Sequence, residues 1–298
     1  MLGRNLRAVA VEKGLPVLAP ARSDMDLASP SSVSSWLKRH RPDLIIHGAG
    51  HVGGIQANMA DPVGFLTLNL DMGLNLVRAA HELGLPRLLN VGSSCMYPRN
   101  APNPLCEESM LTGQLEPTNE GYALAKIVTA KLCEYIVRQS ADRHYRTVIP
   151  CNLYGRYDHF EAQRSHLVPA VISKVHAARA KHAATIELWG DGTARREFMF
   201  AEDAARIILA CAEQIDSLPQ SMNIGVGRDH SVLEYYETAA DVVGWSGRFE
   251  FDLTKPTGMK QKLVDNTQQR QRGLDATTPL ALGLQRTYDY FLETQHAT

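Results

Sequence analysis

Residues 43–50 read Asp43-Leu44-Ile45-Ile46-His47-Gly48-Ala49-Gly50, an apolar run followed by a histidine and three small residues. Short apolar runs bounded by turn residues are typical of strands that are buried on both faces, as in parallel sheets. Helical patterns flank this run at residues 32–40 and 62–83, and a second apolar strand follows at 87–92. The alternation predicts a parallel sheet covered by helices on both faces.

The alternation continues outward from this centre. Toward the N-terminus it predicts a helix over residues 3–13 and a short buried strand over 16–21. Toward the C-terminus a helix from about 122 to 140 precedes a strand at 145–152. After Gly155 the pattern loosens, and we expect helices near 166–178, 202–213, 232–243 and 280–292, with strands near 186–189 and 248–251. We therefore predict an α/β fold: a Rossmann-type doubly wound parallel sheet with a smaller C-terminal α/β substrate lobe.

The start of the sequence lacks a feature that such sheets normally have. A doubly wound sheet opens with a central strand and a Gly-rich turn that approaches a pyrophosphate at the first helix. This sequence begins at Met1-Leu2-Gly3, inside that first helix, and no GxGxxG or GxxGxxG precedes it. We expect the first strand and most of the phosphate loop to be missing, through an incomplete chain or through a protein that lives without its central strand.

Bulk composition excludes several classes of protein. The 298 residues are 21% charged with a net charge of −1, which gives no electrostatic attraction to nucleic acid or membrane. No apolar run approaches the roughly 20 residues of a membrane span. Unpaired cysteine spacings favour a reduced, cytoplasmic protein over a disulfide scaffold or a metal site. The five cysteines are Cys95, Cys106, Cys133, Cys151 and Cys211.

Tyr122 and Lys126 stand four residues apart on an expected helix, so their side chains share one face. A neighbouring ammonium favours the phenolate, which would lower the pKa of Tyr122 and make its proton available for transfer. An aromatic core residue followed by a solvated lysine is an equally ordinary interpretation of this pair alone.

Other candidates end the expected strands. Arg22, Ala49, Gly50, Ser93 and Asn152 each stand at or just beyond the carboxyl end of a predicted strand. Ligands of open parallel sheets bind at that edge. These residues are therefore expected to share one site.

Five motifs together resemble the extended short-chain dehydrogenase/reductases, and within them the GDP-L-fucose synthase family. Tyr-x-x-x-Lys alone marks only the superfamily, whereas the combination is more specific and extends over essentially the whole chain. The motifs are Gly92-Ser93-Ser94-Cys95, His51-Val52-Gly53-Gly54-Ile55, Tyr122-x-x-x-Lys126, Ser165-His166-Leu167-Val168-Pro169-Ala170 and Trp189-Gly190-x-Gly192-Thr193.

The resemblance implies two sets of catalytic residues. Ser93, Tyr122 and Lys126 would form the reductase centre, with Tyr122 as the acid that protonates the C4 oxygen as hydride arrives from NADPH. Cys95 and His166 match the family's base and acid for epimerisation beside the ketone. Outside these motifs, a structural thiol and an ordinary helix-start histidine would be the simpler interpretations of Cys95 and His166.

The resemblance also implies binding residues for the cofactor NADPH. Arg22 could pair with the adenosine 2′-phosphate, although nearby Asp24 makes a preference for NADP less certain. Ala49 and Gly50 are small residues at the end of the expected strand 43–49, where they would let the adenosine approach. The cofactor-binding residues expected are Arg22, Ala49, Gly50, Gly92, Ser93, Lys126, Pro150, Asn152, Leu153 and His166.

The substrate implied is a GDP-sugar, held by Lys174, Trp189, Arg196 and Lys262. Charges suit a diphosphate, and the indole offers a stacking face. Two departures from the family leave the sugar open: Lys174 stands where an arginine is usual, and Thr257 where an aspartate is usual.

The implied reaction is NADPH-dependent 3,5-epimerisation and 4-keto reduction of GDP-4-keto-6-deoxy-D-mannose to GDP-L-fucose. The alternatives are a related GDP-deoxysugar (colitose or a 6-deoxyheptose) and a truncated, non-catalytic remnant. Residues 1–155 would bind NADP, with returning segments near 196–230, and residues 156–298 would mainly form the substrate lobe. A cytoplasmic homodimer through helices 62–83 and 119–140 is expected, with no nucleic-acid or membrane partner.

Overall fold

The computed structural model describes residues 1–161, 165–254 and 259–296, so Thr257 lies outside the described residues. The helices are α1 (Leu2–Glu12), α2 (Pro30–His40), α3 (Ile55–Ala60), α4 (Pro62–Glu82), α5 (Glu120–Gln139), α6 (Leu167–Ala180), α7 (Ala201–Glu213), α8 (Val232–Val243), α9 (Thr267–Arg270) and α10 (Leu280–His296). The strands are β1 (Ile45–His47), β2 (Arg87–Val91), β3 (His144–Pro150), β4 (Asn152–Tyr154), β5 (Thr185–Trp189), β6 (Arg195–Arg196), β7 (Phe198–Phe200), β8 (Ser221–Ile224), β9 (His230–Ser231), β10 (Arg248–Asp252) and β11 (Gln261–Lys262). Short 3₁₀ turns are η1 (Ser94–Met96), η2 (Glu107–Ser109), η3 (Pro117–Asn119) and η4 (Ile215–Ser217).

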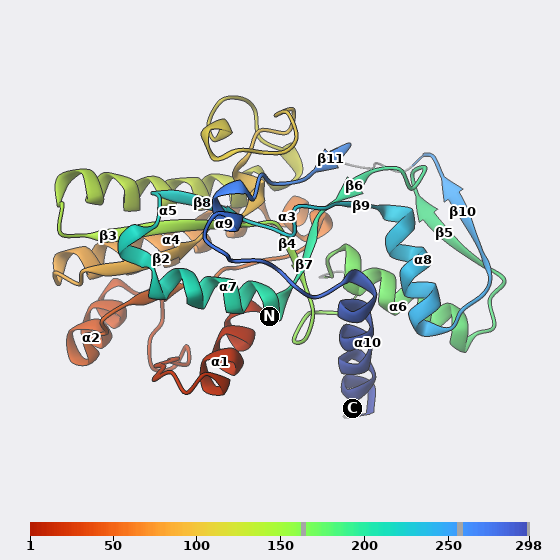
Figure 1. Ribbon diagram of the computed structural model, residues 1–298, viewed down its shortest axis with the longest axis horizontal. Helices are drawn as coiled ribbons and strands as arrows, with labels where there is room; N and C mark the ends of the chain where they lie inside the picture. Colours follow the sequence, from red (N-terminus) through yellow and green to blue (C-terminus); the bar gives the residue numbers. More distant parts are fainter. Residues whose placement is uncertain (162–164, 255–258, 297–298) are drawn as a thin grey trace.

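The main sheet has the parallel order β1-β2-β3-β8, and helices cover both of its faces (Figure 1). Successive side chains of a strand point to opposite faces. Ile45 and its register partner Leu88 pack in a core with α2, α4 and α5. The next residue, Ile46, packs instead with apolar residues of α1 and α7. The predicted parallel sheet with two helical layers is thereby confirmed.

The α4–α5 layer packs closely because small residues occur where the helices cross. Asp61 caps α4 through a hydrogen bond from the Gly64 N–H to its side chain (2.9 Å), and Pro62 occupies the first turn. A Cβ atom on Gly73 of α4 would lie 2.2 Å from Oγ1 of Thr129 on α5. Only glycine fits at this crossing without a shift of the chain.

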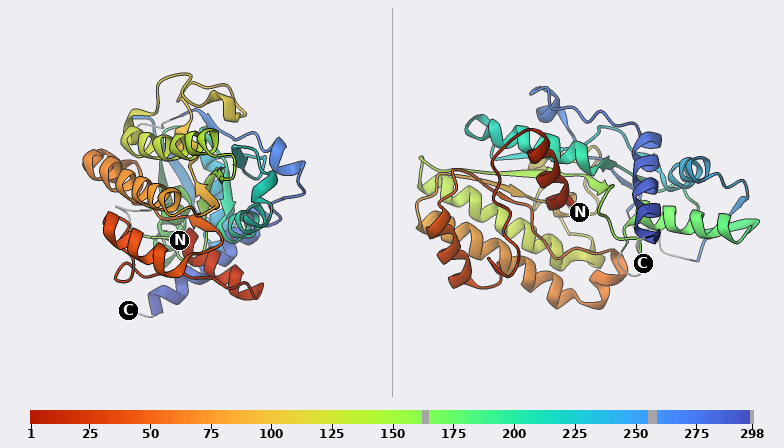
Figure 2. Two further views of the ribbon diagram at one scale, coloured as in Figure 1. Left: turned by 90° about the vertical axis from the view of Figure 1, so that its left-hand side faces the viewer. Right: turned by 90° about the horizontal axis from the view of Figure 1, so that it is seen from below.

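The smaller lobe has a core of its own. It combines the parallel pair β5–β10 with α6, α8 and α10, and its buried side chains include Ile172, Leu188, Tyr235 and Leu284. Figure 2 shows this lobe beside the main sheet rather than on top of it. The chain returns to the main layer through α7, which packs on α1, and through β8, which pairs with β3.

Two predicted strands differ in the structure. Residues 16–21 form no strand, because a strand needs a hydrogen-bonding neighbour and none of the described strands pairs with this segment. β1 is an edge strand of the described main sheet. Residues of β1 and residues 15–20 line the same cavity. The predicted strand at 145–152 is divided: β3 ends at Pro150, and β4 leaves the sheet to pair with β7.

Candidate active site

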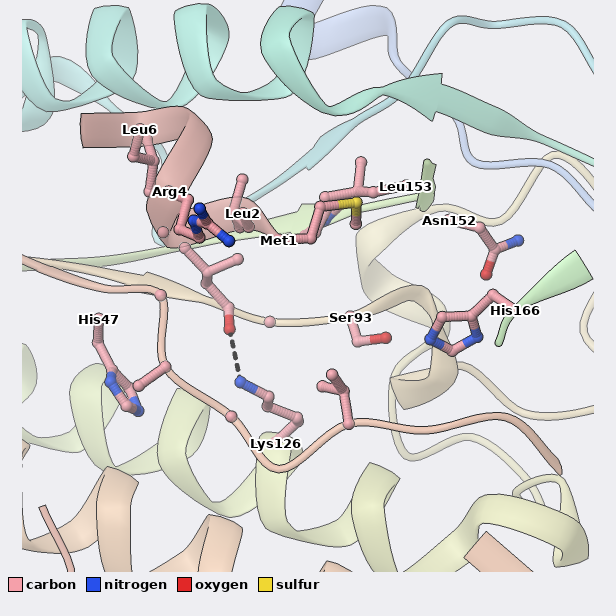
Figure 3. Close-up of a pocket in the computed structure, with 18 of the residues that line it drawn as sticks. Met1, Leu2, Arg4, Leu6, His47, Ser93, Lys126, Asn152, Leu153 and His166 are labelled. Atoms are coloured by element: carbon pink, nitrogen blue, oxygen red, sulfur yellow. Dashed lines mark hydrogen bonds between the residues drawn. The ribbon is translucent and has the colours of Figure 1, made fainter. Parts of the chain in front are cut away.

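A cavity of about 2230 Å³ extends along the carboxyl ends of the main strands and under the smaller lobe. Figure 3 shows the side chains of Ser93, Lys126 and His166 facing it from three separate elements. The structure brings into its lining every predicted site residue except Arg22. These are Ala49, Gly50, Gly92, Ser93, Cys95, Tyr122, Lys126, Pro150, Asn152, Leu153, His166, Lys174, Trp189, Arg196 and Lys262.

Arg22 lies in a turn outside the cavity lining. Its side chain is 84% exposed, and its Nε lies 3.6 Å from Oδ1 of Asp26. Its pairing with the adenosine 2′-phosphate stays a prediction.

Lys126 is buried on α5, and its ammonium donates to the Val91 carbonyl oxygen over 3.1 Å (Figure 3). Burial lowers the pKa of Lys126 to about 8. Its Nζ lies 5.9 Å from the ring centroid of Tyr122. Burial, and secondarily the charge of Cys95, raise the pKa of Tyr122, while the Ser93 side chain opposes them. The direction is opposite to the predicted lowering, because desolvation of the half-buried phenol dominates and the ammonium bonds to Val91.

Cys95 lies in the 3₁₀ turn η1, directly after β2. Its backbone N–H donates to Oγ of Ser93 over 3.3 Å. Its Sγ accepts from Nδ2 of Asn119 (3.2 Å) and from Nζ of Lys262 (3.3 Å). Burial raises the pKa of the Cys95 thiol, but the Lys262 charge and these hydrogen bonds outweigh burial, so the pKa is lowered overall. A thiol in this setting can act as a base.

His166 is the residue that precedes α6, and its side chain makes no capping hydrogen bond to that helix. The imidazole instead faces the cavity (Figure 3). Burial lowers the pKa of His166, and the positive charge of Lys262 lowers it further. The ring is therefore available for proton exchange with a group bound in the cavity.

The predicted sugar-nucleotide residues lie on the smaller-lobe side of the cavity. Arg196 of β6 and Lys262 of β11 are register partners on adjacent parallel strands. Trp189 ends β5 with 48% of its surface exposed, and Lys174 donates from α6 to the Glu187 carbonyl oxygen. Three cations and an indole thus line one side of the space that holds Cys95 and His166.

Sequence reasoning missed two residues of this site. Asn119 precedes α5, where asparagine usually caps the helix, but its side chain bonds to Cys95 instead. His47 ends β1 with 3% exposure, and its Nδ1 has no hydrogen-bond partner in the described part of the chain. Burial, followed by the charge of Lys126, lowers the pKa of His47 to about 3. An imidazole at the carboxyl end of an apolar strand was the available signal for His47; nothing in the sequence pairs Asn119 with Cys95.

Glu197 ties together the segments around the substrate side. It is fully buried, and its carboxylate accepts from the backbone N–H groups of Gly227 (2.8 Å) and Val264 (2.9 Å). Burial raises the pKa of Glu197 to about 7 despite these hydrogen bonds. The carboxylate therefore holds β11 and the loop after β8 against β6.

The described residues also bear on other classes of function. In residues 1–161, 165–254 and 259–296, no group of three or more His, Cys, Asp or Glu side chains is placed to hold a metal ion. Across the same ranges, every helix is too short or too polar to cross a membrane.

Comparisons with known proteins agree with this geometry. Residues 1–225 match the family described as the NAD dependent epimerase/dehydratase family. The chain is 48% identical over 292 residues to a GDP-L-fucose synthase of Azorhizobium caulinodans, covering 98% of this chain and 93% of that protein. It is 46% identical over 296 residues to a GDP-L-colitose synthase of Yersinia pseudotuberculosis, covering 99% and 96%. A GDP-mannoheptose C4 reductase from Campylobacter jejuni, solved with NADP bound, superposes with a TM-score of 0.88 at 27% identity, covering 98% and 95%.

Proposed function

Because this chain belongs to the NAD dependent epimerase/dehydratase family, we propose that it converts GDP-4-keto-6-deoxy-D-mannose into GDP-L-fucose. It is an NADP-dependent epimerase/reductase. One observation carries the proposal: Cys95 and His166 line the same cavity as Ser93, Tyr122 and Lys126. One bound sugar can therefore meet both sets of groups.

In the reductive step, Tyr122 protonates the C4 oxygen of the sugar. NADPH supplies the hydride that reaches C4. The raised pKa of Tyr122 keeps its phenol protonated until negative charge develops on that oxygen. Ser93 offers a hydroxyl hydrogen bond at the same position, which stabilises the developing charge.

In the epimerising steps, Cys95 removes a proton from a carbon next to the ketone. The C–H bond breaks, an S–H bond forms, and the electron pair moves into the enolate. His166 then returns a proton from the opposite face of the sugar, which inverts the carbon. The ketone at C4 makes the protons on both C3 and C5 acidic, so the same two residues serve both positions once Cys95 has released its proton to solvent and His166 has taken one up.

The cavity residues fit a nicotinamide cofactor. The end of β1 offers Gly48, Ala49 and Gly50, where no large side chain obstructs a nucleoside. Lys126 keeps its ammonium beside the Val91 carbonyl, where it can also bond to a ribose hydroxyl. The unpartnered Nδ1 of buried His47 lies along the same wall. These residues would hold NADPH, with Asn152 and Leu153 beside its nicotinamide.

A second candidate substrate is the precursor of GDP-L-colitose or of a GDP-heptose. The 46% identity to the Yersinia enzyme favours the first, and the Campylobacter structure the second. Comparing kcat/KM for the three 4-keto sugars under one condition ranks them. A higher value for either alternative would replace the fucose assignment and keep the mechanism.

The decisive experiment is incubation with GDP-4-keto-6-deoxy-D-mannose and NADPH in D₂O. We expect deuterium at C3 and C5 together with NADPH consumption. Cys95→Ser should abolish deuterium incorporation, whereas Cys106→Ser, a half-buried thiol outside the cavity lining, should not. No deuterium at either carbon would remove the epimerase part, and no NADPH consumption would remove the reductase part.

We also infer a cytoplasmic homodimer formed through α4 and α5. The outer surface of these helices exposes Leu68 (39%), Leu124 (38%), Val128 (41%) and Tyr135 (51%). Exposed apolar side chains on two neighbouring helices support an interface between copies of the chain. Sedimentation equilibrium tests it, with Val128→Lys expected to yield monomer; an unchanged mass would place the interface elsewhere.

A further inference from the structure

A cationic side chain lies against the sulfur of Cys95 before any ligand is bound. Lys262 is only 9% exposed, and its Nζ lies 3.3 Å from Sγ of Cys95. Asn119 places a second N–H donor 3.2 Å from the same sulfur. A sulfur that accepts two N–H donors, one of them charged, is better satisfied as a thiolate than as a thiol.

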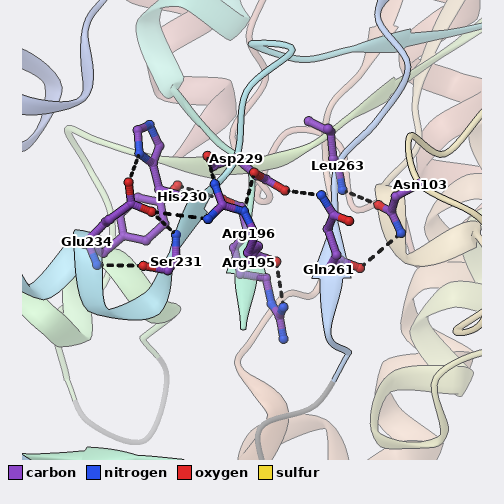
Figure 4. Close-up of polar contacts among 10 residues, drawn as sticks. Asn103, Arg195, Arg196, Asp229, His230, Ser231, Glu234, Gln261 and Leu263 are labelled. Carbon is purple, nitrogen blue, oxygen red and sulfur yellow. Dashed lines mark hydrogen bonds and ion pairs between the residues drawn. The ribbon is translucent and has the colours of Figure 1, made fainter. Parts of the chain in front are cut away.

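The backbone around Lys262 is fixed on both sides by one asparagine. Nδ2 of Asn103 donates to the carbonyl oxygen of Gln261 over 3.4 Å, and its Oδ1 accepts from the N–H of Leu263 over 2.8 Å (Figure 4). These two groups flank Lys262 directly. The direction of its side chain is therefore set by the fold.

A carboxylate ties the same segment to the neighbouring strand. Asp229 accepts from Nε of Arg195 over 2.8 Å and from Nε2 of Gln261 over 2.6 Å (Figure 4). It thereby bridges β6 and β11 beside the backbone pair Arg196–Lys262. Lys262 is thus placed by a network of protein groups.

The titratable groups around Cys95 come from three packed elements. Tyr122 of α5 is kept protonated by its raised pKa, and Lys262 of β11 supplies the positive charge. Burial lowers the pKa of His166 at the start of α6, and the charge of that same lysine lowers it further. Lys262 therefore lowers the pKa of both proposed proton-transfer groups.

We propose that Lys262 is the positioning residue of the Cys95 thiolate, holding the sulfur ionised before the sugar enters. The inference rests on the proposed function, in which Cys95 is the base, and it adds a second task to a lysine expected only to bind the sugar nucleotide. The thiol proton leaves to solvent when the thiolate forms. The thiolate can then accept the proton from the sugar carbon as the enolate forms.

The test measures alkylation of Cys95 by iodoacetamide across pH, without sugar or NADPH, using mass spectrometry of the Cys95 peptide. Removing the charge with Lys262→Gln should raise the pH of half-maximal alkylation by about one unit, the effect of a one-unit rise in pKa. Lys262→Arg, which keeps the charge, should stay within about twofold of the wild type. Lys260→Gln is the matched control, since it removes an exposed charge two residues away on the same segment.

The wild type supplies a reference of its own. Cys95 should reach half-maximal reactivity below the ordinary cysteine value of about pH 8.5, and this comparison needs no variant to fold. The inference is overturned if Cys95 reaches it only above that value, if Lys262→Gln and Lys260→Gln react alike at Cys95, or if Lys262→Arg slows the reaction as much as Lys262→Gln. Loss of deuterium exchange with the alkylation shift intact would instead remove the proposed function and leave this inference standing.

Discussion

The two sides of the cavity are built differently. On the substrate side, Cys95, Asn119, Lys262 and Glu197 are joined by hydrogen bonds between segments far apart in the sequence. On the side of α1, β1 and residues 15–20, the lining is mostly apolar, and the buried Nδ1 of His47 has no partner among the described residues. The proton-transfer groups are thus held by side-chain hydrogen bonds, whereas the nucleotide side depends on strand pairing and apolar contact. Variants on the two sides should fail in different ways.

The largest effect is expected from Tyr122→Phe, which removes the acid and leaves the hydrogen-bonded side intact. Reduction should fall by roughly 10²–10⁴-fold, the usual contribution of a positioned general acid. Deuterium exchange at C3 and C5 should persist, because Cys95 and His166 are unchanged. NADPH consumption and mass spectrometry of the sugar measure the two activities.

Tyr135→Phe is the matched control, because this tyrosine is exposed on the same helix. If Tyr122→Phe lost deuterium exchange and reduction equally, the two activities would not be separable. The contrast between the two sides of the cavity would then not extend to the chemistry.

The next largest effect is expected from Glu197→Gln, which should lower the free energy of unfolding rather than change the chemistry. The amide NH₂ would face one of the backbone donors, Gly227 or Val264, and leave it unsatisfied at a cost of about 1–3 kcal/mol. Denaturant unfolding above the carboxyl pKa of about 7 measures the difference. The same substitution at exposed Glu237 should change little; similar losses in both variants would mean that the buried carboxylate does not organise the substrate side.

Lys126→Met should show a smaller effect that depends on pH. Burial depresses the folded-state pKa of Lys126 to about 8, below its usual value of 10.5. Its contribution to stability is then fully present above pH 10.5 and is lost as pH falls through 8, since the folded protein must hold a buried charge. The variant should therefore gain on the wild type as pH falls from about 10.5 to about 8, and the difference should level off below that. A stability difference that stays flat with pH would mean that the Val91 carbonyl fully compensates the charge.

The smallest effect on stability is expected from an exposed ion pair on the α1 side of the cavity. Lys13 of α1 and Glu213 of α7 form an exposed ion pair of 3.5 Å. Glu213→Gln should alter the free energy of unfolding by less than about 0.5 kcal/mol, as for other exposed pairs. Thermal unfolding at low and high salt checks this; a larger, salt-sensitive loss would show that charge helps to hold the apolar side together.

The same contrast explains what the sequence could predict. Local patterns sufficed for β2, α4 and α5, because the apolar pattern that predicts each of them lies within the element itself. Motif resemblance placed the site residues that line the cavity, Arg22 excepted. Residues 16–21 look like a strand, but a strand also needs a neighbour, which no local pattern reports. The bonds from Asn119 and Lys262 to Cys95 join residues 24 and 167 positions apart, so only the folded chain reveals them.

A single residue separates β3 of the main sheet from β4, which pairs with β7 in a separate two-stranded sheet. Pro150 ends β3, Asn152 begins β4, and the intervening Cys151 still donates its N–H to the Ile224 carbonyl oxygen over 2.9 Å. A rotation of the smaller lobe about this junction would displace each residue in proportion to its distance from it. Asn152 would hardly move, while Trp189 would travel through a longer arc. Such a rotation would let the lobe adjust to a bound ligand while the residues at the junction keep their place.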